Sequence, residues 1–297
     1  MNWTGVIPAI TTNLRASGAV DHPAFAKHCR WMIDSGCTGI VCCGSLGEAA
    51  TLSFDEKIAV AATGVKAVGD RAPVVLGIAA LSTAEAVAQA RAAARAGCAG
   101  LMVLPPYVYS TDWREMKAHV SAVCQATRLS CMLYNNPLAY HTDFQPGHIA
   151  ELAAEHANLH AVKESSADVR RVTAIRALIG DRLAILVGVD DEIVEGMAAG
   201  AQGWIAGLAN AFPVESVELF AAAANGNTAR VRSLYEWFLP LLRLDTVPKF
   251  VQYIKWVQAE VGRGTAVVRP PRLPLAGNEL AEARAILKQA LATRPRL

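Results

Sequence analysis

The sequence predicts an α/β fold, a (β/α)₈ TIM barrel with a C-terminal helical extension. Eight short apolar runs recur through the first two-thirds of the 297 residues, with starts 20 to 34 residues apart. These runs are continuously apolar, which is typical of parallel strands buried on both faces. Alanine-rich stretches with apolar residues at helical spacing lie between them. Eight strands that alternate with helices in a chain of this length indicate a barrel.

The expected strands are residues 5–10, 39–44, 73–78, 100–106, 131–136, 159–164, 183–188 and 203–208. The stretch 82–97 illustrates the intervening helices, because Ser82 and Glu85 have capping-box spacing and Gly97 suits a helix end. The alternative is a doubly wound open sheet, which would carry a glycine-rich dinucleotide motif after its first strand. The residues there read TTNLRASG, so the pattern favours the barrel.

Strand signals stop after about residue 212. Four stretches with helical character follow, at residues 214–226, 228–244, 247–262 and 277–292. We therefore expect a barrel carrying the active site at residues 1–212 and a C-terminal helical domain at residues 213–297.

Composition excludes several classes of protein. Hydrophobic residues make up 53% and charged residues 18% of the chain, as in a compact globular protein. The formal net charge is +2, with Lys and Arg scattered among Asp and Glu, so no nucleic-acid partner is expected. The cysteines are odd in number and form no CxxC pair, which predicts core thiols in a reducing compartment. They are Cys29, Cys37, Cys42, Cys43, Cys98, Cys124 and Cys131.

The sequence also indicates the compartment. The start, MNWTGVIPAI, lacks the basic and apolar regions of a signal peptide. Residues 196–214 are uncharged and long enough to raise the question of a membrane span. Their glycines, with Gln202, Asn210 and Pro213, fit a buried strand and its loops better. We expect a cytoplasmic protein that does not bind membranes.

Catalytic residues of such barrels lie at the C-terminal ends of the strands and on the loops that follow. That rule selects a small set before any motif is considered. The set is Gly44, Ser45, Tyr107, Tyr134, Asn135, Lys163 and residues 188–191.

Lys163 ends the sixth expected strand, in LHAVKESSAD. It could extend toward water or pair with a carboxylate at the barrel mouth. It could also be a nucleophile, because desolvation supplies neutral lysine amine for Schiff-base formation. Tyr134 ends the neighbouring strand and could serve as the proton shuttle, or simply bond to backbone.

The remaining candidates are weaker. Gly44 and Gly47 permit a tight turn with exposed N–H groups, and the following helix could hold a carboxylate at its N-terminus. The seven histidines show no ligand spacing, so no metal is expected, and His141 is expected to be a solvated loop residue. We interpret Asp190 and Asp191 as a helix N-cap with an indirect role behind the substrate.

Four segments together, GSLGEAATLS, YNNP, VKES and GAQGWIAGLAN, resemble the dihydrodipicolinate synthase / N-acetylneuraminate lyase family over nearly the whole chain. The resemblance implies a homotetramer without a cofactor that acts on a small 2-oxo acid. It also implies that Lys163 forms the Schiff base, that Tyr134 shuttles protons, and that Ser45 and nearby N–H groups bind the substrate carboxylate. We expect the rest of the substrate pocket to comprise Gly44, Leu46, Tyr107, Asn135, Tyr140, Gly188 and Ile205.

Three departures from the family pattern limit which of the family's reactions we expect. Leu46 replaces the second hydroxyl of the G-[ST]-T-G-E motif. Ala139 stands where the synthase has an arginine that holds a dicarboxylic substrate, which disfavours the synthase reaction. Val108 aligns with the relay tyrosine, with Tyr107 and Tyr109 on either side. Tyr107 or Tyr109 could supply the relay tyrosine, or the protein could have none.

The segments LPPYVYS and YNNPLAYHTDF look most like a subgroup that deaminates 1-pyrroline-4-hydroxy-2-carboxylate to 2-oxoglutarate semialdehyde in hydroxyproline catabolism. Dehydration of 2-keto-3-deoxy-L-arabonate is the nearest alternative, followed by aldol cleavage of a longer keto acid. A non-catalytic sugar-acid binding protein would not need both Lys163 and Tyr134. A nicotinamide-dependent reductase would show a cofactor motif, and none is visible.

Overall fold

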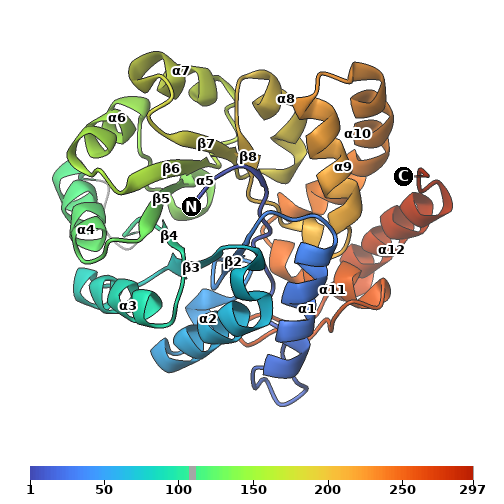
Figure 1. Cartoon of the computed structure of the whole chain (residues 1–297). Coiled ribbons are helices and arrows are strands. Elements are labelled where there is room, and N and C mark those ends of the chain that lie inside the picture. The colour runs from blue at the N-terminus through green and yellow to red at the C-terminus, as the bar shows by residue number, and fades with distance from the viewer. Residues whose placement is uncertain (107–111, 297) are drawn as a thin grey trace.

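The computed structural model describes residues 1–106 and 112–296. Its single sheet contains eight parallel strands in the order β1-β8-β7-β6-β5-β4-β3-β2 (Figure 1). Each strand overlaps one predicted run, so the TIM-barrel prediction is confirmed. The strands are β1 (Gly5–Val6), β2 (Ile40–Cys42), β3 (Val74–Ile78), β4 (Gly100–Val103), β5 (Ser130–Asn135), β6 (Leu159–Glu164), β7 (Ala184–Val187) and β8 (Gly203–Trp204).

The barrel closes between its first two strands beyond the end of β1. Ala9 forms a parallel bridge with Val41, and Ile10 N donates to Val41 O at 2.9 Å. Every residue of β2, β3, β4 and β5 is buried, because side chains fill the barrel interior on one face and the helices cover the other. This two-sided burial explains why the sequence runs are continuously apolar.

Helices follow the strands in the predicted alternation and surround the sheet (Figure 1). Ser82 caps α3 by accepting from Glu85 N at 3.2 Å, as the sequence predicts. The barrel helices are α1 (His22–Asp34), α2 (Phe54–Val68), α3 (Thr83–Arg95), α4 (Trp113–Gln125), α5 (Pro137–Tyr140), α6 (Pro146–Glu155), α7 (Arg170–Ile179), α8 (Ile193–Ala198) and α9 (Pro213–Ala224).

Three further helices form the C-terminal extension: α10 (Thr228–Leu242), α11 (Phe250–Glu260) and α12 (Gly277–Ala292). Figure 1 shows them on one side of the barrel, near α1 and α9. Helix α9 follows β8 directly and so takes the place of the eighth barrel helix, although the sequence grouped it with the extension. The division into domains at residues 212 and 213 stays a prediction.

All seven cysteines are buried and free, as expected for core thiols. Burial raises the pKa of the Cys29, Cys37 and Cys43 thiols to about 12, which keeps them protonated and unreactive near neutral pH. Among the described residues, no helix has the length and apolar character needed to cross a membrane.

Candidate active site

A cavity of about 790 Å³ opens where the strands β2, β5, β6, β7 and β8 end. Seven of the predicted site residues line it: Gly44, Ser45, Leu46, Tyr134, Lys163, Gly188 and Ile205. A smaller cavity of about 250 Å³ beside α1 contains none of them. The strand-end rule and the family resemblance therefore locate the cavity and seven of its lining residues.

Lys163 and Tyr134 are the central pair of this cavity. They are paired in register on β6 and β5, and both side chains are buried, with 6% and 4% of their surface exposed. Lys163 Nζ lies 4.1 Å from the centroid of the Tyr134 ring. No ion pair of Lys163 occurs within the described part of the chain, which argues against the interpretation as a carboxylate partner. An amine so placed meets a ligand in the cavity directly.

The Tyr134 hydroxyl is held by the loop that follows β5. Asn136 Nδ2 donates to this oxygen at 3.0 Å, and the Tyr140 ring packs edge-on against Tyr134 with 5.8 Å between centroids. Tyr140 also hydrogen-bonds through its hydroxyl to Ser45 Oγ. Tyr140 thus links Ser45 to Tyr134, but it does not itself line the cavity, contrary to the prediction.

The conformation of the turn that carries Ser45 differs from the predicted glycine turn. Its left-handed residues are Cys43 (φ 55°) and Glu48 (φ 59°). Gly47 is required for another reason, because a Cβ there would lie 3.0 Å from Cys43 N. Helix α2 begins only at Phe54, and its capping box with Ser53 already uses the N-terminal N–H of Glu56. The predicted carboxylate site at a helix N-terminus is therefore wrong, and the turn itself remains the candidate.

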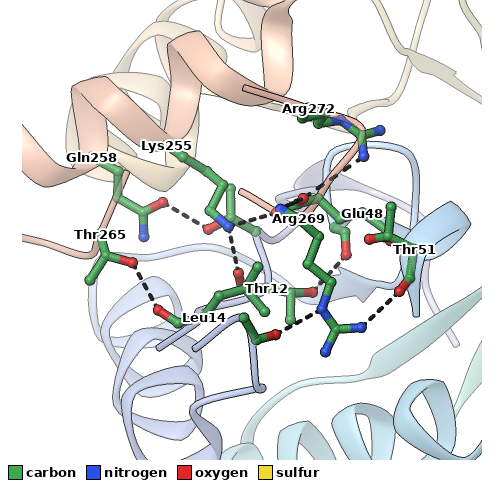
Figure 2. A network of polar contacts seen from close by, with 12 residues as sticks. Thr12, Leu14, Glu48, Thr51, Lys255, Gln258, Thr265, Arg269 and Arg272 are labelled. Atoms are coloured by element: carbon green, nitrogen blue, oxygen red, sulfur yellow. Dashed lines mark hydrogen bonds and ion pairs between the residues drawn. The ribbon is translucent and has the colours of Figure 1, made fainter. Parts of the chain in front are cut away.

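A buried polar network connects this turn to the C-terminal extension (Figure 2). Lys255 Nζ donates to Glu48 Oε1 at 2.6 Å and to Thr12 O at 3.0 Å, and Arg269 N donates to Glu48 Oε2 at 3.0 Å. The side chains of Glu48 and Lys255 are almost fully buried. Sequence reasoning missed this pair, because nothing in the pattern relates two residues 207 positions apart.

Gly188 lies against the lysine. A Cβ at this position would lie 2.5 Å from Lys163 Cε and would overlap Ser165 Oγ. Glycine is therefore required because of the close approach of the Lys163 side chain.

Asn135 is not part of the cavity wall, contrary to the prediction. It is fully buried, and its Nδ2 donates to Glu164 Oε2 at 3.1 Å while Phe144 N donates to its Oδ1 at 3.0 Å. Successive strand residues point to opposite faces, so Asn135 faces away from the side that carries Tyr134. The next residue, Asn136, lines the cavity instead.

Asp190 does not cap a helix, which also corrects an expectation. Its carboxylate is buried and accepts from the N–H groups of Gly207 and Leu208, the latter at 2.7 Å, and from Trp204 Nε1 at 3.0 Å. It thereby ties the β7 loop to the β8 loop. Burial raises the Asp190 pKa to about 6, although the hydrogen bonds from these three donors act to lower it.

Two acidic residues at the cavity were not predicted from the sequence. Glu192 lies in the short helix η3 (Asp190–Glu192), and burial, followed by the charge of Asp191, raises its pKa to about 7. Asp245 ends η5 (Arg243–Asp245) in the C-terminal extension and reaches the same cavity. Asp245 lies within FLPLLRLDTVPKFVQYIK, a segment that shares the subgroup resemblance, but the sequence assigns it no role. The packing of the extension brings it to the barrel mouth.

The other predicted residues lie elsewhere. Tyr107, Val108 and Tyr109, the candidates for the relay position, fall outside the described residues. His141 is exposed and does not line the cavity. In the part of the chain that the structure describes, no three His, Cys, Asp or Glu side chains cluster as metal ligands would.

Comparison with known proteins agrees with this architecture. The family model of the dihydrodipicolinate synthetase family matches residues 2–290. The 4-hydroxy-tetrahydrodipicolinate synthase of Mesorhizobium japonicum is 30% identical over 286 residues, covering 96% of this chain and 98% of the relative. The enzyme of the same name from Citrifermentans bemidjiense is 32% identical over 287 residues, covering 97% and 98%.

Solved structures show the same similarity. The dihydrodipicolinate synthase of Bacillus anthracis superposes with a TM-score of 0.94 at 26% identity, covering 100% of both chains. The synthase of Aquifex aeolicus gives a TM-score of 0.93 at 28% identity, covering 97% of this chain and 98% of its own. The protein is therefore an enzyme that belongs to the dihydrodipicolinate synthetase family.

Proposed function

We propose that the protein is a Schiff-base lyase that acts on a small 2-oxo acid or its cyclic imine. The observation that carries this proposal is the buried amine of Lys163, which lines the cavity 4.1 Å from the Tyr134 ring. Attack of this amine on a substrate carbonyl or imine carbon gives an iminium, which withdraws electrons and acidifies the adjacent carbon. Tyr134 would move the proton at that carbon.

The substrate carboxylate would bind at the Ser45 turn. Ser45 supplies a hydroxyl, Leu46 lines the cavity beside it, and the turn offers backbone N–H groups. A carboxylate held there would place the 2-oxo carbon toward Lys163 and leave the substrate chain to extend past Gly188 and Ile205. The rest of the cavity, toward Glu192 and Asp245, would receive the far end of the substrate.

Within this class, we propose deamination of 1-pyrroline-4-hydroxy-2-carboxylate to 2-oxoglutarate semialdehyde and ammonia. Lys163 would attack C2 and open the ring, leaving a free amine on C5. Loss of a C3 proton and of the C4 hydroxyl, followed by tautomerisation, would give a C5 imine that water hydrolyses. The support is the subgroup similarity of YNNPLAYHTDF together with a cavity that combines Lys163, Tyr134 and acidic side chains.

Two related reactions compete with this assignment. 2-Keto-3-deoxy-L-arabonate carries a hydroxyl on C5 and would be dehydrated to the same product by the same steps. The synthase reaction is favoured by the names of the relatives but disfavoured by Ala139, a methyl side chain at the cavity where the family pattern has arginine. We further propose a homotetramer, from the family resemblance alone.

Borohydride trapping tests the proposal. The protein is incubated with pyruvate, the pyrroline or deoxy-arabonate, reduced, and analysed by mass spectrometry for an adduct on Lys163. No adduct with any of them would refute the Schiff base, and near wild-type turnover by Lys163→Ala would refute the assigned nucleophile.

The substrate is decided by comparing kcat/KM for the pyrroline and for deoxy-arabonate. We expect the pyrroline to be preferred. A clear preference for deoxy-arabonate, or formation of 4-hydroxy-tetrahydrodipicolinate at a comparable rate, would overturn the deaminase assignment.

A further inference from the structure

Asp245 is an acidic residue that the C-terminal extension contributes to the barrel cavity. It ends η5, follows the buried Leu244, and lines the same cavity as Lys163 and Gly207. A Cβ built on Gly207 would overlap the Asp245 carboxyl, so glycine at this position is what lets Asp245 approach the β8 loop. Asp245 Oδ1 is buried and has no hydrogen-bond partner among the described residues.

The surroundings of Asp245 favour its neutral form. Its neighbour Asp190 accepts three donors, Trp204 Nε1 and the N–H groups of Gly207 and Leu208, which stabilise an ionised acceptor. Burial raises the pKa of Asp245 well above its ordinary value, and the charge of Asp190 raises it further. Lys163 opposes this rise, so its charge acts on the Asp245 carboxyl. Burial and the neighbouring Asp190 carboxylate thus both favour the protonated form of the Asp245 carboxyl.

A protonated carboxyl with an unsatisfied oxygen is a hydrogen-bond and proton donor. Two other groups in the cavity are less suited to that task. Asp191 is already ion-paired, with its Oδ2 3.4 Å from Arg243 Nε. Tyr134 is already assigned to the C3 proton, and its hydroxyl accepts from Asn136 Nδ2. Glu192 and Asp245 are then the two acids with a raised pKa at this end of the cavity. We choose Asp245 because its Oδ1 is buried and lacks a hydrogen-bond partner among the described residues.

We propose that Asp245 is the general acid that protonates the group leaving from C4 of the Schiff-base intermediate. This inference rests on the proposed function and adds a residue to it. In the enamine formed after loss of the C3 proton, the nitrogen lone pair re-forms the C2 iminium, and the C2–C3 electrons form the C3–C4 double bond. The C4–O bond breaks, its electron pair stays on oxygen, and the Asp245 proton joins that oxygen to release water.

The cycle also returns the proton. After water has left, the C3–C4 double bond is conjugated with the iminium, and the C5 protons become acidic. The Asp245 carboxylate takes one of them, the C5–H electrons enter the conjugated system, and Asp245 is again neutral for the next turnover. Acid and base roles for one carboxyl in successive steps require its proton affinity to be raised, which burial beside Asp190 provides.

The test compares Asp245→Asn, which keeps size and neutrality but has no acidic proton, with the wild type. Three activities are measured: the borohydride adduct with pyruvate, exchange of pyruvate methyl protons for deuterium by NMR, and turnover of the hydroxylated pyrroline. Pyruvate has no leaving group, so its exchange needs Lys163 and Tyr134 only. Asp70→Asn, at an exposed acid in η2 (Gly69–Arg71), is the matched control.

We expect Asp245→Asn to keep the adduct and the pyruvate exchange while kcat on the pyrroline falls roughly 10²- to 10⁴-fold, the usual contribution of a general acid. A substrate whose leaving group needs no proton, 4-chloro-2-oxobutanoate, should be eliminated by Asp245→Asn at the wild-type rate. Gly207→Ala, which displaces the Asp245 carboxyl, should reproduce the selective loss on the pyrroline.

Other outcomes overturn the inference. Unchanged pyrroline turnover by Asp245→Asn would show that no proton comes from this residue. Parallel loss of pyruvate exchange and pyrroline turnover would show that Asp245 supports the structure around Lys163 instead. Absence of an adduct in the wild type with pyruvate, the pyrroline and deoxy-arabonate alike would refute the proposed function itself, before any variant of Asp245 is compared.

Discussion

Tyr134 and Lys163 face each other across strands β5 and β6, paired in register, with the lysine Nζ 4.1 Å from the tyrosine ring centroid. Residues paired in register on parallel strands point to the same side of the sheet, so both side chains enter the cavity together. The register between β5 and β6 shifts between Cys131 and Met132. It is regular from the pair Met132–Ala161 to the pair Asn135–Glu164, the stretch that contains Tyr134 and Lys163.

Replacing Tyr134 by phenylalanine separates proton transfer from Schiff-base formation. We expect kcat to fall roughly 10²- to 10⁴-fold, because the ring and its packing remain while the hydroxyl is lost. The borohydride adduct on Lys163 should still form. Turnover at the wild-type rate would exclude Tyr134 as the shuttle.

Ser45→Ala should weaken binding of the substrate carboxylate. A hydrogen bond to a charged group contributes about 1.5–3 kcal/mol, which corresponds to a roughly 10- to 100-fold lower kcat/KM. Steady-state kinetics on the preferred substrate measure the effect, with Ser45→Thr as the variant that retains the hydroxyl. An unchanged kcat/KM in Ser45→Ala would place the carboxylate elsewhere.

Gly188→Ala should slow Schiff-base formation by displacing the Lys163 side chain, although the lysine itself is unchanged. The new methyl group would lie 2.5 Å from Lys163 Cε in the present geometry, so the side chain must move. We expect slower adduct formation with pyruvate in a folded protein. Gly147→Ala is the matched control, because a Cβ there meets no atom within 4 Å. Equal adduct rates for the two variants would contradict the prediction.

Lys255→Met should destabilise the protein strongly. It removes the nearer of two cations paired with the buried Glu48 carboxylate, since Arg272 Nη1 lies 3.8 Å from Glu48 Oε2, and breaking a buried ion pair costs about 3–5 kcal/mol. The measurement is the free energy of unfolding in urea. Lys249→Met, which breaks the more exposed pair with Glu279, should cost about 1 kcal/mol or less. Similar losses in both variants would refute the structural importance of the Glu48 network.

His28 should make stability depend on pH. Burial lowers its pKa to about 4, although the hydrogen bond with Asn210 opposes this, whereas the unfolded value is near 6.5. Between these values the unfolded chain binds a proton that the folded protein does not. The free energy of unfolding should therefore fall as pH decreases from 6.5 to 4, by at most about 3 kcal/mol from this residue.

Comparing His28→Gln with the wild type isolates that contribution, since other buried histidines titrate in the same direction. The variant should lose less stability than the wild type over the same pH range. The exposed His141, replaced by Asn because its backbone φ is 57°, is the control and should behave as the wild type. Parallel curves for all three proteins would exclude the His28 effect.

The barrel could be predicted from the sequence because its signal is local and repeated. Each strand is a short apolar run, the helices between them have helical periodicity, and some also have a side-chain cap, as at Ser82. The strand-end rule then brings Ser45, Tyr134, Lys163 and Gly188 to one cavity. These residues are far apart in the sequence but occupy equivalent places in successive βα units.

Asn135 and Asp190 show where this reasoning fails. Asn135 is next to Tyr134 in sequence, yet the alternation of a strand turns it toward Glu164, on the other face. Asp190 is the first residue of η3, a position that suggests a helix cap. Its carboxylate instead accepts hydrogen bonds from Gly207 N and Leu208 N in the loop after β8. Both errors follow from assigning a direction to a side chain from sequence position alone.

The sequence by itself determined the order of strands and helices, the end of the barrel from which the chemistry must operate, and the lysine and tyrosine that meet there. Only the tertiary structure decided how Glu48 pairs with Lys255 and how Asp245 reaches the cavity beside Asp190 and Gly207. Periodicity and capping act within a few turns of chain. Burial and the pairing of distant charges depend instead on how the C-terminal extension packs on the barrel, which no local pattern encodes.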